Sequence, residues 1–187
     1  MSSFNEYIDT AEIDFIRAYF QREGRLCTFN KGSFFLRAGD CPPRMALVVS
    51  GYFKYSVIDS RGEECITGFA LCNNLVGDYY GCLHHVPALN HIKAVTNSTC
   101  LVVSARKVSD MLAAHADVRI KFGETLFRMA HKRYLSLCCQ TPKERYTELL
   151  KRCPDLLQHI TLKEFASFLQ ITPTHLSRIR KEILQGK

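Results

Sequence analysis

The stretch TLKEFASFLQITPTHLSRIRKEI, residues 161–183, holds two short helical patterns joined by only a few residues. Thr172 is a residue type that caps the start of a helix, and Pro173 suits the first helical position, where a missing N–H costs nothing. The apolar residues of both patterns recur at helical spacing, so they would pack the helices on each other: Phe165, Leu169, Ile171, Leu176 and Ile179. The stretch predicts two helices that cross steeply around a tight turn.

The spacing of this pair is that of a helix-turn-helix, and the alternative is an ordinary solvated helical hairpin. Ala166 stands where the second helix crosses the first, and that position requires a small side chain. Gln170 occupies the turn position that usually holds Gly, so we expect a left-handed backbone there or a slightly different turn. With Leu176 and Ile179 inward, the second helix presents a face without acidic residues: Thr174, His175, Ser177, Arg178 and Lys181.

This face predicts contact with double-stranded DNA. A recognition helix places its N-terminal half in the major groove, where Arg178 can donate two hydrogen bonds to guanine O6 and N7. The other polar residues of the face suit phosphate or nearby base contacts. Residues 118–187 hold 14 Lys and Arg against 6 Asp and Glu, whereas residues 1–117 hold 11 against 12. The basic excess therefore lies in the same third of the chain as the motif, which favours a polyanionic partner.

A long helix is predicted over residues 116–139, because the helical pattern persists until Thr141-Pro142 stops it. Its apolar residues form two stripes, so the helix needs two partners. The first stripe is interrupted by Arg133 and consists of Phe122, Leu126, Met129 and Leu137; the second consists of Ile120, Phe127, Ala130, Tyr134 and Cys138. One partner is the preceding domain. The other is the same helix in a second subunit, as a C2 homodimer, or further parts of the same subunit. We take the first stripe with Arg133 as the candidate dimer contact.

Residues 25–104 alternate short β-rich runs with Gly and Asp turns, which predicts a β-sandwich or a β-barrel. A helical pattern precedes this β domain over residues 4–24, and a short helix, KVSDMLAAH, follows it. The segment DSRGE predicts a hairpin turn in which Gly62 takes a positive φ. Regularity breaks at residues 77–91, where we expect a short helix and a loop. The predicted fold class is α+β, with helices flanking the β domain and an all-α C-terminal domain.

In this order and spacing, the chain resembles the Crp/Fnr family of bacterial transcription regulators. The resemblance rests on KGSFFLRAGD, VVSGYFKYSVIDSRGEE, LVGDYYG, CLVVSARKVSDML and ITPTHLSRIRKEI. It implies a cyclic-nucleotide-binding-like sensor domain over residues 1–115, a dimerisation helix over residues 116–140 and a helix-turn-helix DNA-binding domain over residues 141–187. The sensor domain would be an antiparallel β-roll of the double-sheet jelly-roll type. It also implies that the state of the sensor sets the orientation of two helices that read a palindromic operator.

The resemblance places the family's base-reading positions at Pro173, Thr174 and Arg178, of which only Arg178 keeps a typical side chain. Because Pro173 cannot read a base, we expect a preferred site unlike that of the catabolite activator protein. Family members usually continue into a β wing, and the sequence stops at Lys187, so we expect this backbone contact to be absent. RNA polymerase and an unidentified small-molecule effector are further candidate partners.

The resemblance also locates a degenerate effector pocket. Relatives that bind a cyclic nucleotide use Gly-Glu, then Arg-Ser or Arg-Thr about ten residues later. Here Gly77-Asp78 and Asn90-His91 stand at these places. An anionic phosphate in a small buried cavity needs a paired cation, and His91 supplies one only when it is protonated. We therefore do not expect cyclic AMP to bind, and no cofactor is predicted.

The cysteines and histidines raise a metal alternative. Cys82, His84, His85, His91 and Cys100 are residue types that bind zinc or iron, but their spacing matches no structural zinc pattern. The nine cysteines are scattered without a C-x-x-C pair, which indicates reduced thiols in a cytoplasmic protein. We interpret Cys138-Cys139 as part of a buried helix face rather than as a redox pair.

The sequence supports neither an enzyme nor a membrane protein. It contains no P-loop, G-x-S-x-G or H-E-x-x-H motif, no signal peptide and no apolar run of membrane-spanning length. The remaining alternative to a DNA-binding regulator is a ligand-binding module, for a cyclic nucleotide or another small effector, whose helical tail contacts a protein partner.

Overall fold

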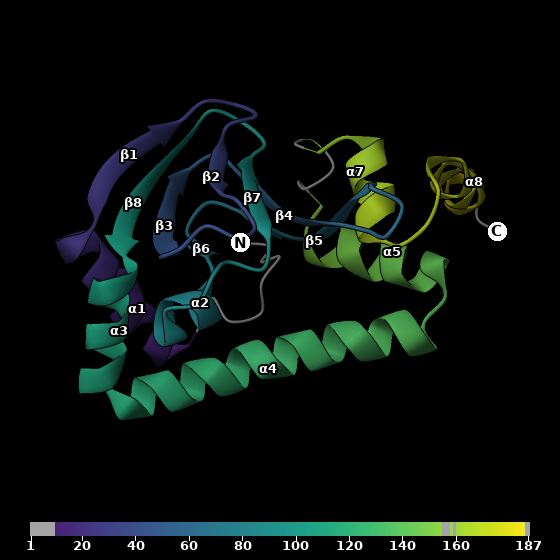
Figure 1. The fold of residues 1–187 in the computed structure, drawn as a ribbon. Helices are drawn as coiled ribbons and strands as arrows, with labels where there is room; N and C mark the ends of the chain where they lie inside the picture. Colours follow the sequence, from purple (N-terminus) through teal and green to yellow (C-terminus); the bar gives the residue numbers. More distant parts are fainter. Residues whose placement is uncertain (1–9, 155–157, 159, 186–187) are drawn as a thin grey trace.

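The structure is a computed structural model that describes residues 10–154, 158 and 160–185 (Figure 1). The N-terminal helical pattern begins at Phe4 in the sequence, but its first residues lie outside the described part. The observed helix α1 (Ala11–Glu23) starts after Thr10, whose Oγ1 accepts a hydrogen bond from Ile13 N at 3.4 Å. Thr10 is therefore the N-cap of α1.

Two four-stranded antiparallel sheets form the roll, with strand orders β1-β8-β3-β6 and β2-β7-β4-β5. The α+β fold class predicted from the sequence is confirmed. Strand β6 falls in a segment that the sequence analysis treated as a connection, because three residues are too few to show alternation. The strands are β1 (Arg25–Phe29), β2 (Phe34–Leu36), β3 (Arg44–Ser50), β4 (Phe53–Ile58), β5 (Glu64–Ala70), β6 (Leu75–Gly77), β7 (His91–Ala94) and β8 (Ser98–Ser104).

The hairpin between β4 and β5 ends in the predicted turn. The carboxylate of Asp59 accepts hydrogen bonds from the backbone N–H groups of Arg61 and Glu63, at 2.8 and 3.0 Å. Gly62 has the expected positive φ, 82°. The hairpin reaches from the roll toward the C-terminal helices (Figure 1). It is thus the part of the roll that comes closest to the helix-turn-helix.

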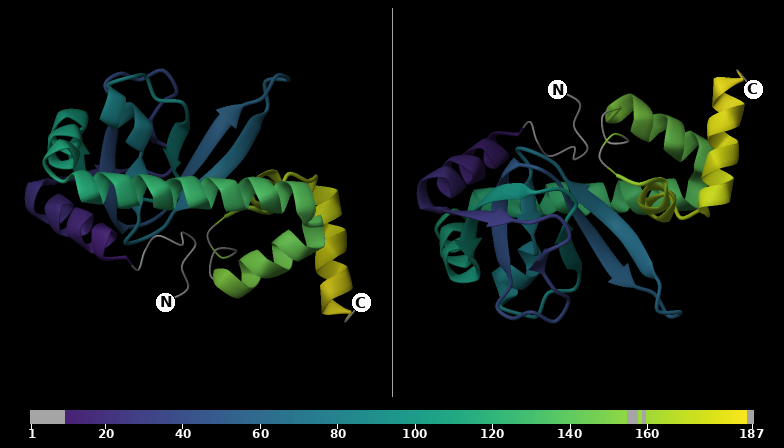
Figure 2. Two further views of the ribbon diagram at one scale, coloured as in Figure 1. Left: turned by 90° about the horizontal axis from the view of Figure 1, so that it is seen from below. Right: turned by 90° about the horizontal axis from the view of Figure 1, so that it is seen from above.

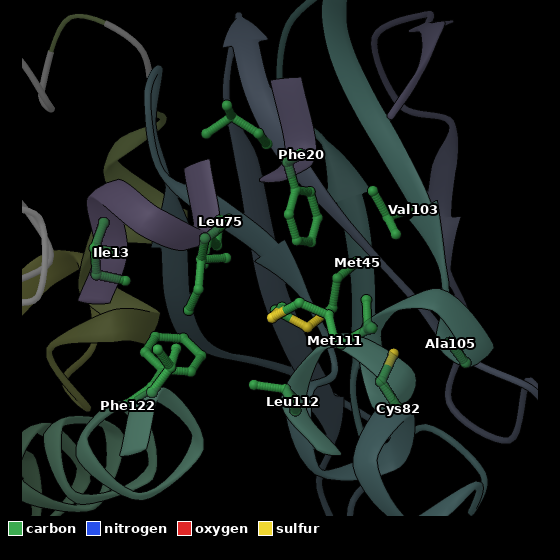
Figure 3. Packing of buried hydrophobic residues seen from close by; sticks show 14 residues of the cluster. Ile13, Phe20, Met45, Leu75, Cys82, Val103, Ala105, Met111, Leu112 and Phe122 are labelled. Carbon is green, nitrogen blue, oxygen red and sulfur yellow. The ribbon is translucent and has the colours of Figure 1, made fainter. Parts of the chain in front are cut away.

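Three helices complete the sensor part: α2 (Tyr79–His84), α3 (Ala105–Ala114) and the start of the long α4 (Ala116–Cys139). Their inward faces pack with α1 and the β1-β8-β3-β6 sheet into one buried cluster (Figure 3). Phe122 of α4 is 3% exposed in this cluster, and burying such a side chain stabilises a fold by about 1.5–3 kcal/mol. Phe122 therefore fastens α4 to the roll.

Helix α4 runs along the roll from α3 to α5 (Figures 1 and 2). The C-terminal helices are α5 (Pro142–Arg152), α7 (Leu162–Phe168) and α8 (Pro173–Leu184). Helix α8 lies at the end of the molecule remote from α1 and α3 (Figure 2). None of the helices that the structure describes is long and apolar enough to cross a membrane.

A separate buried cluster joins the C-terminal helices to the β4-β5 hairpin. It contains Ile66 and Phe69 of β5 together with the inward residues of α5, α7 and α8. The rings of Phe69 and Phe168 lie 5.6 Å apart. The helix-turn-helix is therefore docked on the sensor domain through apolar contacts as well as along the chain.

Candidate functional site

Helices α7 and α8 form the helix-turn-helix that the spacing predicts. Thr161 caps α7 in a capping box, since its Oγ1 accepts from Glu164 N and the Glu164 carboxylate accepts from Thr161 N. Ala166 is 0% exposed, in keeping with the small residue required where the helices cross. Gln170 has φ 58°, so the left-handed turn expected from the sequence is confirmed.

The inward residues of α8 are Leu176 and Ile179, which are 0% and 3% exposed. The five predicted DNA-contacting residues are all exposed, and they lie on the opposite side of the helix: Thr174, His175, Ser177, Arg178 and Lys181. The Ser177 hydroxyl donates to Pro173 O at 3.0 Å, so it is already engaged within its own helix. The first two turns therefore present Arg178 as their exposed charged group, and Lys181 follows in the last turn.

The acidic residue of α8 lies beyond these turns. The Glu182 carboxylate lies 3.8 Å from Lys143 Nζ on α5, in a pair that is about half exposed, so Lys143 partly offsets its charge. Thr172 Oγ1 accepts from His175 N at 3.2 Å and caps the helix start. The exposed N-terminal half of α8 consequently has the geometry and the charge that suit a nucleic-acid groove.

An ion triad fastens α7 to the β4-β5 hairpin. Lys54 Nζ lies 2.9 Å from carboxylate oxygens of both Glu64 and Glu164. Burial acts to lower the pKa of Lys54, but its hydrogen bonds with Glu164 and Glu64 outweigh burial, and the pKa is raised. Burial acts to raise the pKa of both carboxyl groups, but the bonds with Lys54 outweigh it and leave their pKa values lowered. All three groups are therefore held in their charged forms.

Two further hydrogen bonds extend the same contact. Ile66 N donates to Ser167 Oγ at 3.0 Å, and Gln170 Nε2 lies 3.0 Å from Cys65 Sγ. Each bond joins β5 to α7 or to the turn that follows it. The turn before α8 is thus held by the β4-β5 hairpin.

The predicted effector-pocket residues come together only in part. The Asp78 carboxylate accepts from Gly81 N at 2.7 Å, which caps α2, and from Leu89 N at 3.0 Å, next to Asn90. These bonds close the loop over residues 77–91 onto itself. Gly77 has φ 143°, and a Cβ there would lie 2.4 Å from Arg44 O, so the position requires Gly.

The His91 side chain contacts residues outside the loop over residues 77–91. Its Nδ1 accepts a hydrogen bond from Ala38 N at 3.1 Å, and its ring meets that of Phe34 edge-on. His91 Nδ1 is therefore already engaged by the backbone and is not free to hold a cyclic phosphate through that atom.

A small apolar cavity of about 240 Å³ lies between the roll and α4, lined among others by Met45, Gly77 and Tyr79. Tyr55 also lines it, and its hydroxyl accepts from Gly77 N at 3.0 Å. Burial raises the pKa of Tyr55 to about 12, so this hydroxyl stays protonated. Asn90 does not line this cavity but a larger one beyond Tyr55.

The structure corrects the candidate dimer contact on α4. Phe122 is buried in its own subunit, and Leu126 and Met129 pack against the same cluster. Arg133 points toward α7, and its guanidinium carbon lies 4.0 Å from the centre of the Phe168 ring. This stripe faces its own chain because the roll and the helix-turn-helix both lie on that side of α4. It is therefore not available to a second subunit. Leu137 is the exception, since it remains 38% exposed.

The second stripe of α4 is exposed to solvent, whereas the first stripe packs within the chain. Ile120, Phe127 and Tyr134 are 54%, 72% and 63% exposed. Large apolar side chains at this exposure, aligned along one helix, form the kind of patch that marks an interaction surface. We call this stripe, with Ala130 and Cys138, the outer face of α4.

The cysteines are divided between core and surface. Burial raises the pKa of Cys82 and Cys100 to about 12, which makes both thiols poor ligands and nucleophiles. Cys138 and Cys139 are exposed in the single subunit, so the interpretation that they form part of a buried face is wrong within one chain. Among the described residues, no three His, Cys, Asp or Glu side chains gather as a metal site would require.

The sequence analysis missed the ion triad at Lys54 and an arginine cluster formed by Arg133, Arg145 and Arg152. Lys54 alternates with apolar residues on β4 and looks like an ordinary outward-facing residue. The triad partner Glu164 is distant in sequence, so no local pattern links the two. The one available signal was Arg133, which interrupts an apolar stripe of α4.

Comparisons with known proteins agree with this architecture. Residues 26–115 match the model of the cyclic nucleotide-binding domain family. FixK2 from Bradyrhizobium japonicum is similar in structure, with a TM-score of 0.73 and 18% identity over 87% of this chain and 86% of FixK2. In fold, the chain resembles Crp/Fnr-family regulators such as FixK2. No curated protein matches its sequence.

Two more Crp/Fnr-like structures cover nearly the whole chain. A mutant of CooA from Carboxydothermus hydrogenoformans has a TM-score of 0.69 and 14% identity, over 95% of this chain and 85% of CooA. CLP from Xanthomonas campestris, a global regulator responsive to c-di-GMP, has a TM-score of 0.66 and 13% identity, over 92% of each chain. At these identities the likeness establishes the fold, including the arrangement of sensor domain, long helix and C-terminal helices.

Proposed function

We propose that this Crp/Fnr-like protein is a DNA-binding transcription regulator that acts as a homodimer and is not an enzyme. The observation that carries the proposal is the exposed half of α8. Its first two turns present Arg178 without an acidic residue, Lys181 follows in the last turn, and Leu176 and Ile179 are buried against α7. Arg178 reads a guanine in the major groove, and Lys181 contacts a neighbouring phosphate or base.

The outer face of α4 supports the homodimer. Phe127 and Tyr134 are more than half exposed on a helix that runs most of the length of the molecule (Figure 2). Packing this face against its copy about a two-fold axis would bury it and set two α8 helices side by side. A two-fold dimer of helix-turn-helix units reads two half-sites that are related as a palindrome, about 34 Å apart.

Selection of bound fragments from random double-stranded DNA, using the purified full chain, tests the proposal. We expect enrichment of a palindrome with two half-sites one helical turn apart. Recovery of random sequence after repeated rounds would contradict DNA reading. It would favour the alternative in which the helical tail contacts a protein.

The sensor domain is proposed to respond to something other than cyclic AMP. Asp78 is an acid and is occupied as the cap of α2, and Asn90 stands where cyclic-nucleotide-binding relatives place an Arg, so residues 77–91 contain no Lys or Arg for the cyclic phosphate. Leaving a phosphate unpaired in such a site costs several kcal/mol. Calorimetry with cyclic AMP and cyclic GMP should show no tight binding, and a micromolar or stronger complex with either would contradict this part of the account.

A further inference from the structure

The start of α8 differs in chemistry from the rest of its exposed face. Pro173 and Thr174, the first two residues of the helix, are both exposed and uncharged. Arg178, which is also exposed, lies one turn further along the helix. Residues four apart share one side of a helix, with their Cβ atoms about 5–6 Å apart. A duplex that Arg178 contacts is therefore also within reach of Thr174.

The Thr174 side chain is available to a partner outside the protein. The hydroxyl of Thr172 accepts a hydrogen bond from His175 N, and that of Ser177 donates one to Pro173 O. Within the described part of the chain, the Thr174 hydroxyl forms no such bond. Thr174 consequently presents both an uncommitted hydroxyl group and an exposed methyl group to the surface that Arg178 faces.

Thymine is the base whose major-groove edge matches a threonine side chain. It presents the O4 acceptor next to the C5-methyl group, and the other three bases carry no methyl group there. The Thr174 hydroxyl can donate to O4 while its methyl group packs against the C5-methyl group. The side chain of Pro173 has no hydrogen-bonding group, so it adds apolar surface at the same end of α8. A polar base edge placed against that surface would lose water without gaining a partner.

We propose, resting on the proposed function of DNA reading, that Thr174 is a second specificity-determining residue and selects a thymine in each half-site. Stacked base pairs are about 3.4 Å apart, so Thr174 and Arg178 contact bases that are about one or two base pairs apart. Each half-site therefore contains a thymine close to the guanine that Arg178 contacts. Arg178 recognises its base by hydrogen bonds alone, whereas Thr174 also uses the contact between two methyl groups.

Replacement of thymine by deoxyuridine tests this contact, because it removes the C5-methyl group and keeps O4 and base pairing. Fluorescence anisotropy compares the full chain on the selected palindrome and on duplexes in which each thymine of one half-site is replaced in turn. The base pair at which Arg178→Ala tolerates substitution marks the guanine. Replacing a thymine within about two base pairs of it should weaken wild-type binding about fourfold, as expected when one methyl group is no longer buried.

Two variants of Thr174 separate its methyl group from its hydroxyl group. Thr174→Ser removes the methyl group, and its affinities for the thymine and deoxyuridine duplexes should agree within about twofold. Thr174→Val keeps a methyl group at this exposed position and should discriminate between the two duplexes as the wild type does. Thr28→Ser changes an exposed threonine of β1 in the same way and is the matched control, so it should also behave as the wild type.

The outcomes distinguish this proposal from DNA reading itself. The proposal is overturned if no thymine within that distance discriminates, or if Thr174→Ser keeps the fourfold difference of the wild type. Either result leaves the reading of guanine by Arg178 intact, because the palindrome and its dependence on Arg178 are measured separately. Failure to enrich any palindrome, or equal binding by Arg178→Ala, would overturn the proposed function and this proposal with it.

Discussion

Single residues determine whether α7 and α8 of the helix-turn-helix can pack against each other. Ala166 is fully buried at the crossing of α7 and α8, where its methyl group leaves no room for a longer side chain. Ala166→Leu should therefore destabilise the C-terminal domain by about 1–3 kcal/mol, the usual cost of overpacking a buried site. Thermal unfolding followed by circular dichroism measures the change.

Ala113→Leu is the matched control, because Ala113 is an exposed alanine on α3. It should change the free energy of unfolding by less than about 0.5 kcal/mol. Equal stability of the two variants would mean that α7 and α8 do not cross at Ala166.

At the level of single residues, some features of the structure could be predicted from the sequence and others could not. The inward positions of the motif could be predicted from the spacing of its apolar residues. The left-handed conformation of Gln170 could be predicted because Gly usually occupies that position of the turn. The pairing of Lys54 with Glu164 did not, because the two residues are more than a hundred positions apart and neither belongs to a recognisable pattern. Contacts between distant elements depend on how domains dock, which local patterns do not encode.

Among the elements, α4 is the one with two distinct faces. Its inner face packs on the roll, and its outer face exposes Phe127 and Tyr134. Placing a charge there should prevent a second subunit from packing, because the charge would be buried without a partner. Phe127→Asp should convert a dimer into a monomer, as measured by light scattering at micromolar concentration.

Ala113→Asp introduces the same charge on exposed α3 and should leave the dimer intact. A monomeric wild-type protein, or a dimeric Phe127→Asp variant, would contradict the assignment of the outer face. The sequence predicted both stripes of α4 correctly, but not which one faces outward. That choice depends on where the roll and the helix-turn-helix lie around the helix, and only the tertiary structure shows it.

At the scale of the whole molecule, the ion triad of Lys54, Glu64 and Glu164 links the sensor domain to the helix-turn-helix. The pKa values of both carboxyl groups are lowered, so their contribution is present above the unfolded value of 4.5 and is lost as pH falls through the folded values. The pKa of Lys54 is raised, so its contribution is present below 10.5 and is lost as pH rises through the folded value. The triad should therefore contribute its full stabilisation between pH 4.5 and pH 10.5.

Glu164→Gln tests this pH dependence. At pH 7 the variant should unfold at lower temperature than the wild type, by the equivalent of about 1 kcal/mol, since partial exposure screens the pair. The difference should shrink as the pH falls below 4.5, because the wild-type carboxyl groups become protonated as the pH passes through their lowered pKa values. Glu23→Gln, which alters an exposed pair with Lys107, should change the unfolding temperature little at any pH in this range. A Glu164→Gln deficit that stays constant as the pH falls would show that the ionised pair is not its cause.

The central claim concerns the whole molecule and rests on one face of α8: the protein reads DNA with Arg178. Fluorescence anisotropy with the selected palindrome and a scrambled duplex tests it most directly, for the wild type, Arg178→Ala and the exposed control Arg106→Ala. Arg178→Ala should lose about 1–3 kcal/mol on the palindrome and tolerate substitution at one base pair of each half-site, with little change on the scrambled duplex. Arg106→Ala should match the wild type. Equal affinity of wild type and Arg178→Ala for the palindrome would contradict the account.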